Sequence, residues 1–386
     1  MKKAFLFILV FIIALSFSVF SVSAEETEST ENTGQDSYEV ISDKDKQSLF
    51  DSLSDDAKKS LSNLGIDSVD PGFIDNLTFD KIISEIIANA ANVSKNPLKS
   101  MLSVIAIMLL SSLLSGLKNT LNNGKMQQVI DVVSTLCITS ALVLPVSNVI
   151  INTTNTVLTA SNFMLAYIPI MLVVLVSSGR FVSGSAYYSM MVMAGQAVSQ
   201  IASKIVVPLL NSFLGISIAA SISPNVNLSG ISASISKIIK WLLCFIMTMF
   251  TALLSFRQII TTSIDNVSTR AVRFTLTSLV PVVGSALSDA YKTIQSSVNL
   301  IKSGLGVFVI IAIFVVFLPI ILECLIWVLT IGVSKSVGEI LSLNQPCKVL
   351  ESVSTVITTL LAIVFCIMAV FIISTAIVLL MGGASE

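Results

Sequence analysis

The sequence contains no histidine among its 386 residues, and only 12% of its residues are charged. The absence of histidine excludes histidine-ligated zinc, a Ser-His-Asp catalytic triad and a histidine phosphorelay. Soluble domains are about 45–50% apolar and about 25% charged, whereas this chain is 54% hydrophobic. The composition therefore excludes an ordinary soluble enzyme, and it excludes a disordered chain, which needs low hydrophobicity and high charge. It indicates a membrane protein.

Cysteine pairs and phosphate-binding motifs are also lacking. The five cysteines all follow residue 136, none falls in a C-x-x-C spacing, and four lie in apolar runs. A free thiol in such a run behaves as a small hydrophobe, so neither a metal site nor a disulfide framework is expected. No G-x-x-x-x-G-K-[ST] motif occurs. The chain is therefore not expected to hydrolyse ATP, and no cofactor is predicted.

Charge is unevenly distributed along the chain. Met1–Ala24 begins with two lysines, continues as an apolar run and ends in Val-Ser-Ala. This pattern is typical of a cleavable signal peptide, with an uncleaved anchor as the alternative. Residues 25–97 then carry 16 acidic and 6 basic side chains, whereas residues 98–386 carry 7 acidic and 14 basic ones. The sequence predicts an acidic extracytoplasmic region at 25–97 and a multi-pass membrane region at 98–386.

Two short amphipathic helices are expected in the acidic region. The first has apolar residues at helical spacing from Leu49 to Leu64, and Gly65 follows as a stop signal. The second has an apolar stripe that begins at Phe79, with Asn76 or Thr78 as its N-cap. So small a region would gain stability from a partner or from the membrane surface. A plain spacer is the alternative.

Apolar segments dominate the chain from Leu98 onward. A bilayer core about 30 Å thick needs about 20 helical residues. The candidate spans are Leu98–Leu117, Val129–Ile151, Phe163–Ser178, Tyr187–Leu210, Trp241–Phe256, Leu305–Ile331 and Val353–Met381. The shorter pieces Asn211–Ile222 and Phe274–Leu287 could be re-entrant or interfacial. The predicted fold class is an all-α polytopic membrane protein with roughly six to eight transmembrane helices.

Basic residues orient the first part of this region. They place Lys118 and Lys125 in the cytoplasm, an uncharged loop at Asn152–Asn162 outside, and Arg180 inside. Both flanks of the Trp241–Phe256 segment are basic, which leaves the later topology open.

Glu323 lies well inside the apolar run Leu305–Ile331. An ionised carboxylate at such a position costs several kcal/mol unless it is paired or hydrated. Glu323 is therefore a candidate proton site on a transport pathway. The alternative is one half of a buried ion pair, with Arg257 or Arg273 as its partner.

The stretch from Arg257 to Lys302 is the most polar part of the membrane region. Its centre, Phe274–Leu287, is a short apolar piece interrupted by proline and glycine and flanked by charge. This pattern suggests a half-helix hairpin or a gate, whereas the alternative is a cytoplasmic loop with a surface helix. The candidate functional residues of the membrane region are Glu323, Arg270, Arg273, Pro281, Gly284, Asp289 and Lys302.

Residues 271–307 read AVRFTLTSLVPVVGSALSDAYKTIQSSVNLIKSGLGV. In the order of its charged, small and proline residues, this stretch resembles the signature block of the stage III sporulation protein AE family. A glycine usually follows the position of Gly284 in that family, and Ser285 stands here instead. The resemblance at this level covers about a tenth of the chain, while the general layout agrees over nearly all of it.

The resemblance implies a non-enzymatic membrane subunit of the channel complex, or feeding tube, that links mother cell and forespore and supports late forespore gene expression. It implies a place in the mother-cell membrane around the forespore. The implied partners are a secretion-type ATPase, small membrane proteins, ring-forming proteins and a forespore membrane protein, with no nucleic acid. The family offers no catalytic residues to transfer. The alternative is a stand-alone secondary transporter with Glu323 as its proton site; an intramembrane enzyme is least favoured, because no second carboxylate accompanies Glu323.

Overall fold

The computed structural model describes residues 41–69, 72–73, 77–118, 124–201, 204, 207–222, 229–279 and 284–380. Within these ranges the chain forms helices and no strands, which confirms the all-α fold class. The predicted signal peptide lies outside the described residues. The helices are α2 (Asp43–Asp51), α3 (Asp55–Leu64), α4 (Phe79–Lys118), α5 (Gly124–Ser177), α6 (Phe181–Ile201), α7 (Val207–Ile222), α8 (Ser229–Leu279), α9 (Gly284–Ile340) and α10 (Asn344–Leu380).

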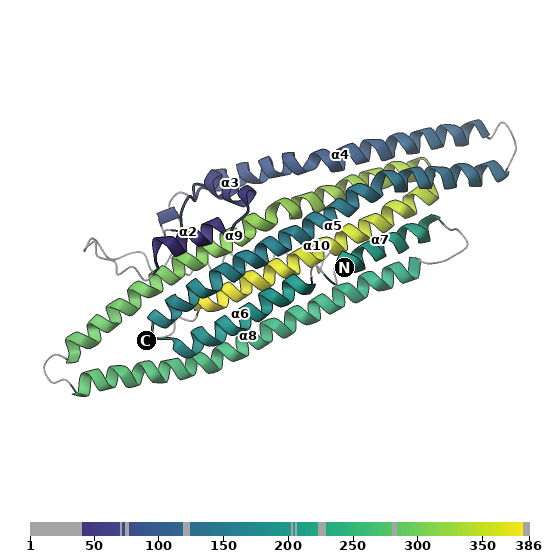
Figure 1. Ribbon diagram of the computed structural model, residues 1–386. Coiled ribbons are helices and arrows are strands. Elements are labelled where there is room, and N and C mark those ends of the chain that lie inside the picture. The colour runs from purple at the N-terminus through teal and green to yellow at the C-terminus, as the bar shows by residue number, and fades with distance from the viewer. Residues whose placement is uncertain are drawn as a thin grey trace.

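The long helices lie roughly along one axis and pack in layers (Figure 1). The central layer contains α5, α9 and α10, and the α9–α10 hairpin forms its most extensive contact. α4 covers α5 and α9 on one side together with the small helices α2 and α3, while α6, α7 and α8 lie on the other. Large apolar side chains fill the centre, among them the fully buried Phe308, Trp327 and Phe371.

Five of the described helices, α4, α5, α8, α9 and α10, are long and apolar enough to cross a membrane. The longest, α9, has 57 residues. At 1.5 Å per residue such a helix is about 86 Å long, against a hydrocarbon core of about 30 Å. These helices therefore extend well beyond a bilayer. Within the most apolar part of each helix, 67% of the residues are buried in α9 and 61% in α10, but only 12% are buried in α8. Helix α8 therefore presents an outer face.

The predicted loop at Asn152–Asn162 is wrong, because α5 continues through it as one helix. The segments Val129–Ile151 and Phe163–Ser178, counted separately in the prediction of six to eight spans, therefore belong to one element. The helix accommodates this polar stretch because its threonine hydroxyls find acceptors within the helix. Thr153 and Thr154 each donate to the carbonyl four residues earlier, at 2.8 and 3.0 Å. Such bonds satisfy a hydroxyl within the helix itself.

Other boundaries also differ from the prediction. The segment Tyr187–Leu210 is divided between α6 and α7, and α4 runs uninterrupted across residue 97, where the membrane region was expected to begin. The first amphipathic helix is split into α2 and α3, since Ser54 accepts a bond from the Ala57 N–H and caps α3. Its predicted stop is confirmed: Gly65 has a φ of 85°, the left-handed conformation that favours glycine at a helix end.

Candidate functional site

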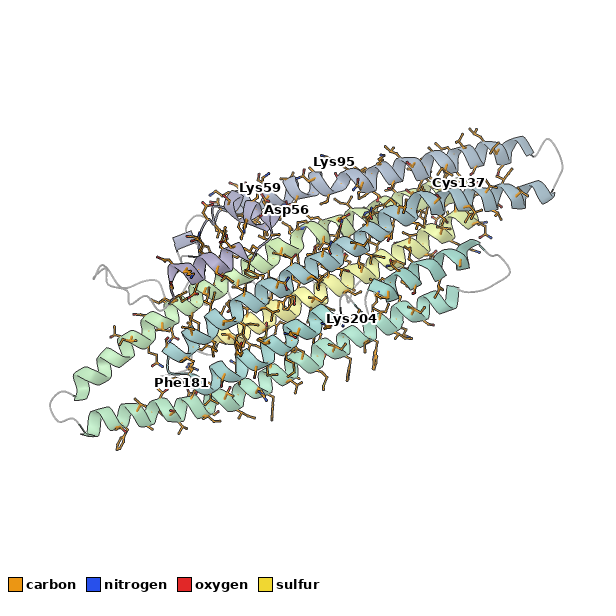
Figure 2. The ribbon with its side chains drawn as sticks, in the orientation of Figure 1. Asp56, Lys59, Lys95, Cys137, Phe181 and Lys204 are labelled. Atoms are coloured by element: carbon orange, nitrogen blue, oxygen red, sulfur yellow. The ribbon has the colours of Figure 1, made fainter. Side chains whose placement is uncertain are left out.

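A tight turn joins α5 to α6 at the end of the bundle where Figure 2 shows Phe181. Gly179 has a φ of 80°, a conformation that glycine adopts without steric cost. The Gly179 N–H donates to the Val176 carbonyl at 2.9 Å, and the Arg180 N–H donates to the Leu175 carbonyl at 3.0 Å. These two bonds form a Schellman motif that ends α5. The next helix begins at once, because the Arg180 carbonyl accepts from the Gly184 N–H at 2.9 Å.

Asp265 of the neighbouring helix α8 caps the start of α6. Its two carboxylate oxygens accept from the backbone N–H groups of Val182, at 3.1 Å, and Ser183, at 2.8 Å. Arg180 occupies the N-cap position but has no side-chain acceptor, so Asp265 performs the function that Ser, Asn or Asp usually performs locally. Its charge also suits the positive end of the helix dipole.

Two cations are buried beside this carboxylate. Arg180 is 5% exposed, Lys302 of α9 is 2% exposed and Asp265 is 2% exposed. Burial lowers the pKa of Arg180, and the Coulombic attraction of Asp265 offsets part of that shift. Among the described residues, Arg180 Nη1 and Lys302 Nζ have no hydrogen-bond partner. The site thus contains two positive charges and one negative charge away from water.

A glutamine completes this charged core. Gln295 of α9 donates from Nε2 to the Ser178 carbonyl at 3.1 Å, which ties α9 to the α5–α6 turn. Arg180, Asp265, Gln295 and Lys302, here called the turn cluster, come from three separate parts of the chain. The cluster fixes α6, α8 and α9 against one another by polar contacts at the end of an otherwise apolar bundle. This arrangement can position the helices around the turn, and the burial of its side chains keeps them away from a substrate in solution.

Glu323 lies elsewhere, half-buried on α9 near the Asn152 side chain on α5. No salt bridge within the described part of the chain involves Glu323. Arg257, one of the two suggested partners, is exposed on α8 and lines a small cavity between α6, α8 and α10. Asn152 belongs to a row of exposed asparagines on one face of α5: Asn148, Asn152, Asn155 and Asn162. We call this row the asparagine stripe.

The remaining predicted residues are scattered. Arg270 is exposed on α8, and Gly284 is the first residue of α9. Arg273 and Asp289 lie in the backbones of α8 and α9, but their side chains are outside the described set, as is Pro281 altogether. Of the predicted residues with a described side chain, only Lys302 reaches the turn cluster.

Sequence reasoning missed two members of the turn cluster as site residues. Arg180 entered the prediction only as a charge that orients a helix, and Asp265 was not among the predicted residues. A signal for Arg180 did exist in the Ser-Ser-Gly-Arg run, which places one charge at a tight turn between two apolar segments. Nothing local indicates that Asp265, more than 80 residues later, would cap that turn.

The fold indicates a polytopic helical membrane protein, with long apolar helices and a buried charged cluster at the α5–α6 turn. The stage III sporulation protein AE family model matches residues 70–382. The chain therefore belongs to the stage III sporulation protein AE family, as its signature block indicated, and its role is in sporulation.

A curated relative is the stage III sporulation protein AE of Bacillus subtilis (strain 168), which is 25% identical over 154 residues. That match covers 40% of this chain and 39% of the relative, so it spans well under half the length of either protein. No solved structure matches the chain.

Proposed function

We propose that this protein is a non-enzymatic subunit of a channel complex that joins mother cell and forespore during sporulation. The family supplies the sporulation role. The observation that best supports a channel is the asparagine stripe. It is an exposed polar face on a helix that is otherwise apolar enough to span a membrane. Polar side chains at membrane depth face a partner helix or a water-filled path rather than lipid.

The position of Glu323 favours a subunit over a stand-alone transporter. A secondary transporter binds its substrate in a cavity near the bilayer midplane, at broken helices. Glu323 instead is half-buried beside the exposed Asn152. Two cavities lie between the described helices, one between α6, α8 and α10 and one between α8, α9 and α10, and Glu323 lines neither of them. The polar groups that could line a path thus face outward, where further subunits would complete it.

The N-terminal helices offer exposed charged side chains to the expected partners. Asp56 and Lys59 lie on α3, and Lys95 lies on α4 (Figure 2). We assign this acidic N-terminal region to contacts with ring-forming proteins between the two membranes, and the basic loops to contacts with a secretion-type ATPase. In this scheme the protein lies in the mother-cell membrane around the forespore with its N-terminal region extracytoplasmic.

The stripe gives a direct test. Asn155→Leu combined with Asn162→Leu removes two side-chain amides from the stripe and leaves the helix-forming backbone unchanged. Asn211→Leu, at an exposed position on α7, is the matched control. We expect the double variant to accumulate in the membrane at the normal level but to lose a late forespore-specific reporter. The control should keep the reporter. Full reporter activity in the double variant would exclude the stripe from channel function.

A further inference from the structure

A cavity of about 250 Å³ lies between α8, α9 and α10, at the charged end of the α9–α10 hairpin. Its walls combine basic and hydroxyl side chains: Lys240, Lys335, Glu351, Ser354, Thr355 and Thr358, with Ile331 and Gly332. One water molecule takes about 30 Å³ of liquid volume, so the cavity has room for a much larger polar group. Gly332 leaves it open, since a Cβ at this position would meet nothing within 4 Å.

The lining carries one uncompensated positive charge. Lys335 Nζ is bound to the Glu351 carboxylate at 3.1 Å and approaches Glu339 at 3.8 Å. Lys240 is half-buried, and no carboxylate of the described residues lies within salt-bridge distance of it. A half-buried ammonium without a counter-ion favours binding of an anion.

The cavity adjoins an apolar track along α8. Trp241, next to Lys240 in sequence, is 67% exposed and stacks on Phe245, with ring centroids 5.6 Å apart. Phe245 and Met249 continue this track at four-residue intervals, each about half exposed. Tryptophan next to lysine at the end of an apolar run marks the membrane–water interface, and basic pockets between transmembrane helices bind lipid head groups.

We propose that this cavity binds a negatively charged phosphate group, presented by an anionic membrane lipid whose acyl chains lie along Trp241, Phe245 and Met249. Lys240 donates to the phosphate, the Ser354 hydroxyl supplies a further donor, and Glu351 stays paired with Lys335. The free cation accounts for the preference for an anion, and the apolar track accounts for a lipid as its source.

The test uses the full chain purified in detergent, with added phosphatidylglycerol, phosphatidylcholine or inorganic phosphate, and reads thermal stability and bound lipid. We expect phosphatidylglycerol to raise the melting temperature and phosphatidylcholine to leave it unchanged. Lys240→Met should weaken the apparent affinity about tenfold, the loss of one charge-assisted hydrogen bond. Lys240→Arg should restore binding. Lys348→Met, an exposed lysine outside the cavity, controls for general attraction of anions.

Each outcome decides one part of the proposal. Stabilisation by phosphatidylglycerol alone, lost in Lys240→Met, supports a lipid head group. Stabilisation by inorganic phosphate to the same extent, also lost in that variant, supports the anion site but overturns the lipid as its source. Equal binding by Lys240→Met and the native chain, or equal losses in Lys240→Met and Lys348→Met, overturns the site. Because the readout is binding, the test is independent of the proposed sporulation channel.

Discussion

Asp265 offers the sharpest test of the turn cluster. The carboxylate is 2% exposed and makes two hydrogen bonds, to the N–H groups of Val182 and Ser183. Loss of an N-cap acceptor costs about 0.5–2 kcal/mol. Asp265 makes these bonds as a charged group, and a hydrogen bond to a charged group contributes about 1.5–3 kcal/mol. The two estimates describe the same contacts, so Asp265→Ala should lower the free energy of unfolding by about 1.5–3 kcal/mol.

Asp265→Asn separates the cap from the charge. The asparagine retains one oxygen that can accept from either backbone N–H group, so this variant should be less destabilised than Asp265→Ala. Asp67→Asn, at an exposed position, should change stability by less than about 0.5 kcal/mol. Denaturant unfolding in micelles measures all three, with the fluorescence of the buried Trp327 as the probe. A free energy of unfolding for Asp265→Ala within about 0.5 kcal/mol of the native value would refute the stabilising role of this carboxylate as a cap.

Three further predictions concern Lys302, Gly338 and Glu323. Lys302→Met should raise the free energy of unfolding in micelles by about 1–3 kcal/mol, because a buried donor without a partner costs that much. A decrease of the same size would mean that the Lys302 ammonium is paired. Gly338→Ala places a Cβ 2.7 Å from Cys347 Sγ and should cost about 1–3 kcal/mol, whereas Gly116→Ala, in open space, should stabilise its helix slightly in the same unfolding assay. Glu323→Gln should reduce spore yield without lowering the protein level in membranes, and a normal yield would leave Glu323 without a functional role.

The sequence predicts the features that depend on local chemistry. Hydrophobic content and run length predict an all-α membrane protein, and Gly65 predicts a helix end that the structure confirms. The loop prediction at Asn152–Asn162 is wrong because hydrophobicity alone does not reveal that Thr153 and Thr154 bond to their own helix. A prediction from hydrophobic periodicity treats such a polar stretch as a loop.

The turn cluster could not be predicted for a different reason. Its charged members Arg180, Asp265 and Lys302 lie in separate parts of the chain and are brought near one another only by packing of the bundle. Lys302 was selected through the family resemblance and the charge of its segment, and its burial was not expected. Long-range capping by Asp265 leaves no periodic pattern near the turn that it caps, so the structure alone locates it.

The central claim is that this protein acts in a complex needed for forespore development. Deleting its gene in the sporulating host and following a late forespore-specific reporter after engulfment tests that claim most directly. We expect a silent reporter and shrunken forespores, with both restored by a copy of the native gene. Forespores of normal size with full reporter activity would contradict the account.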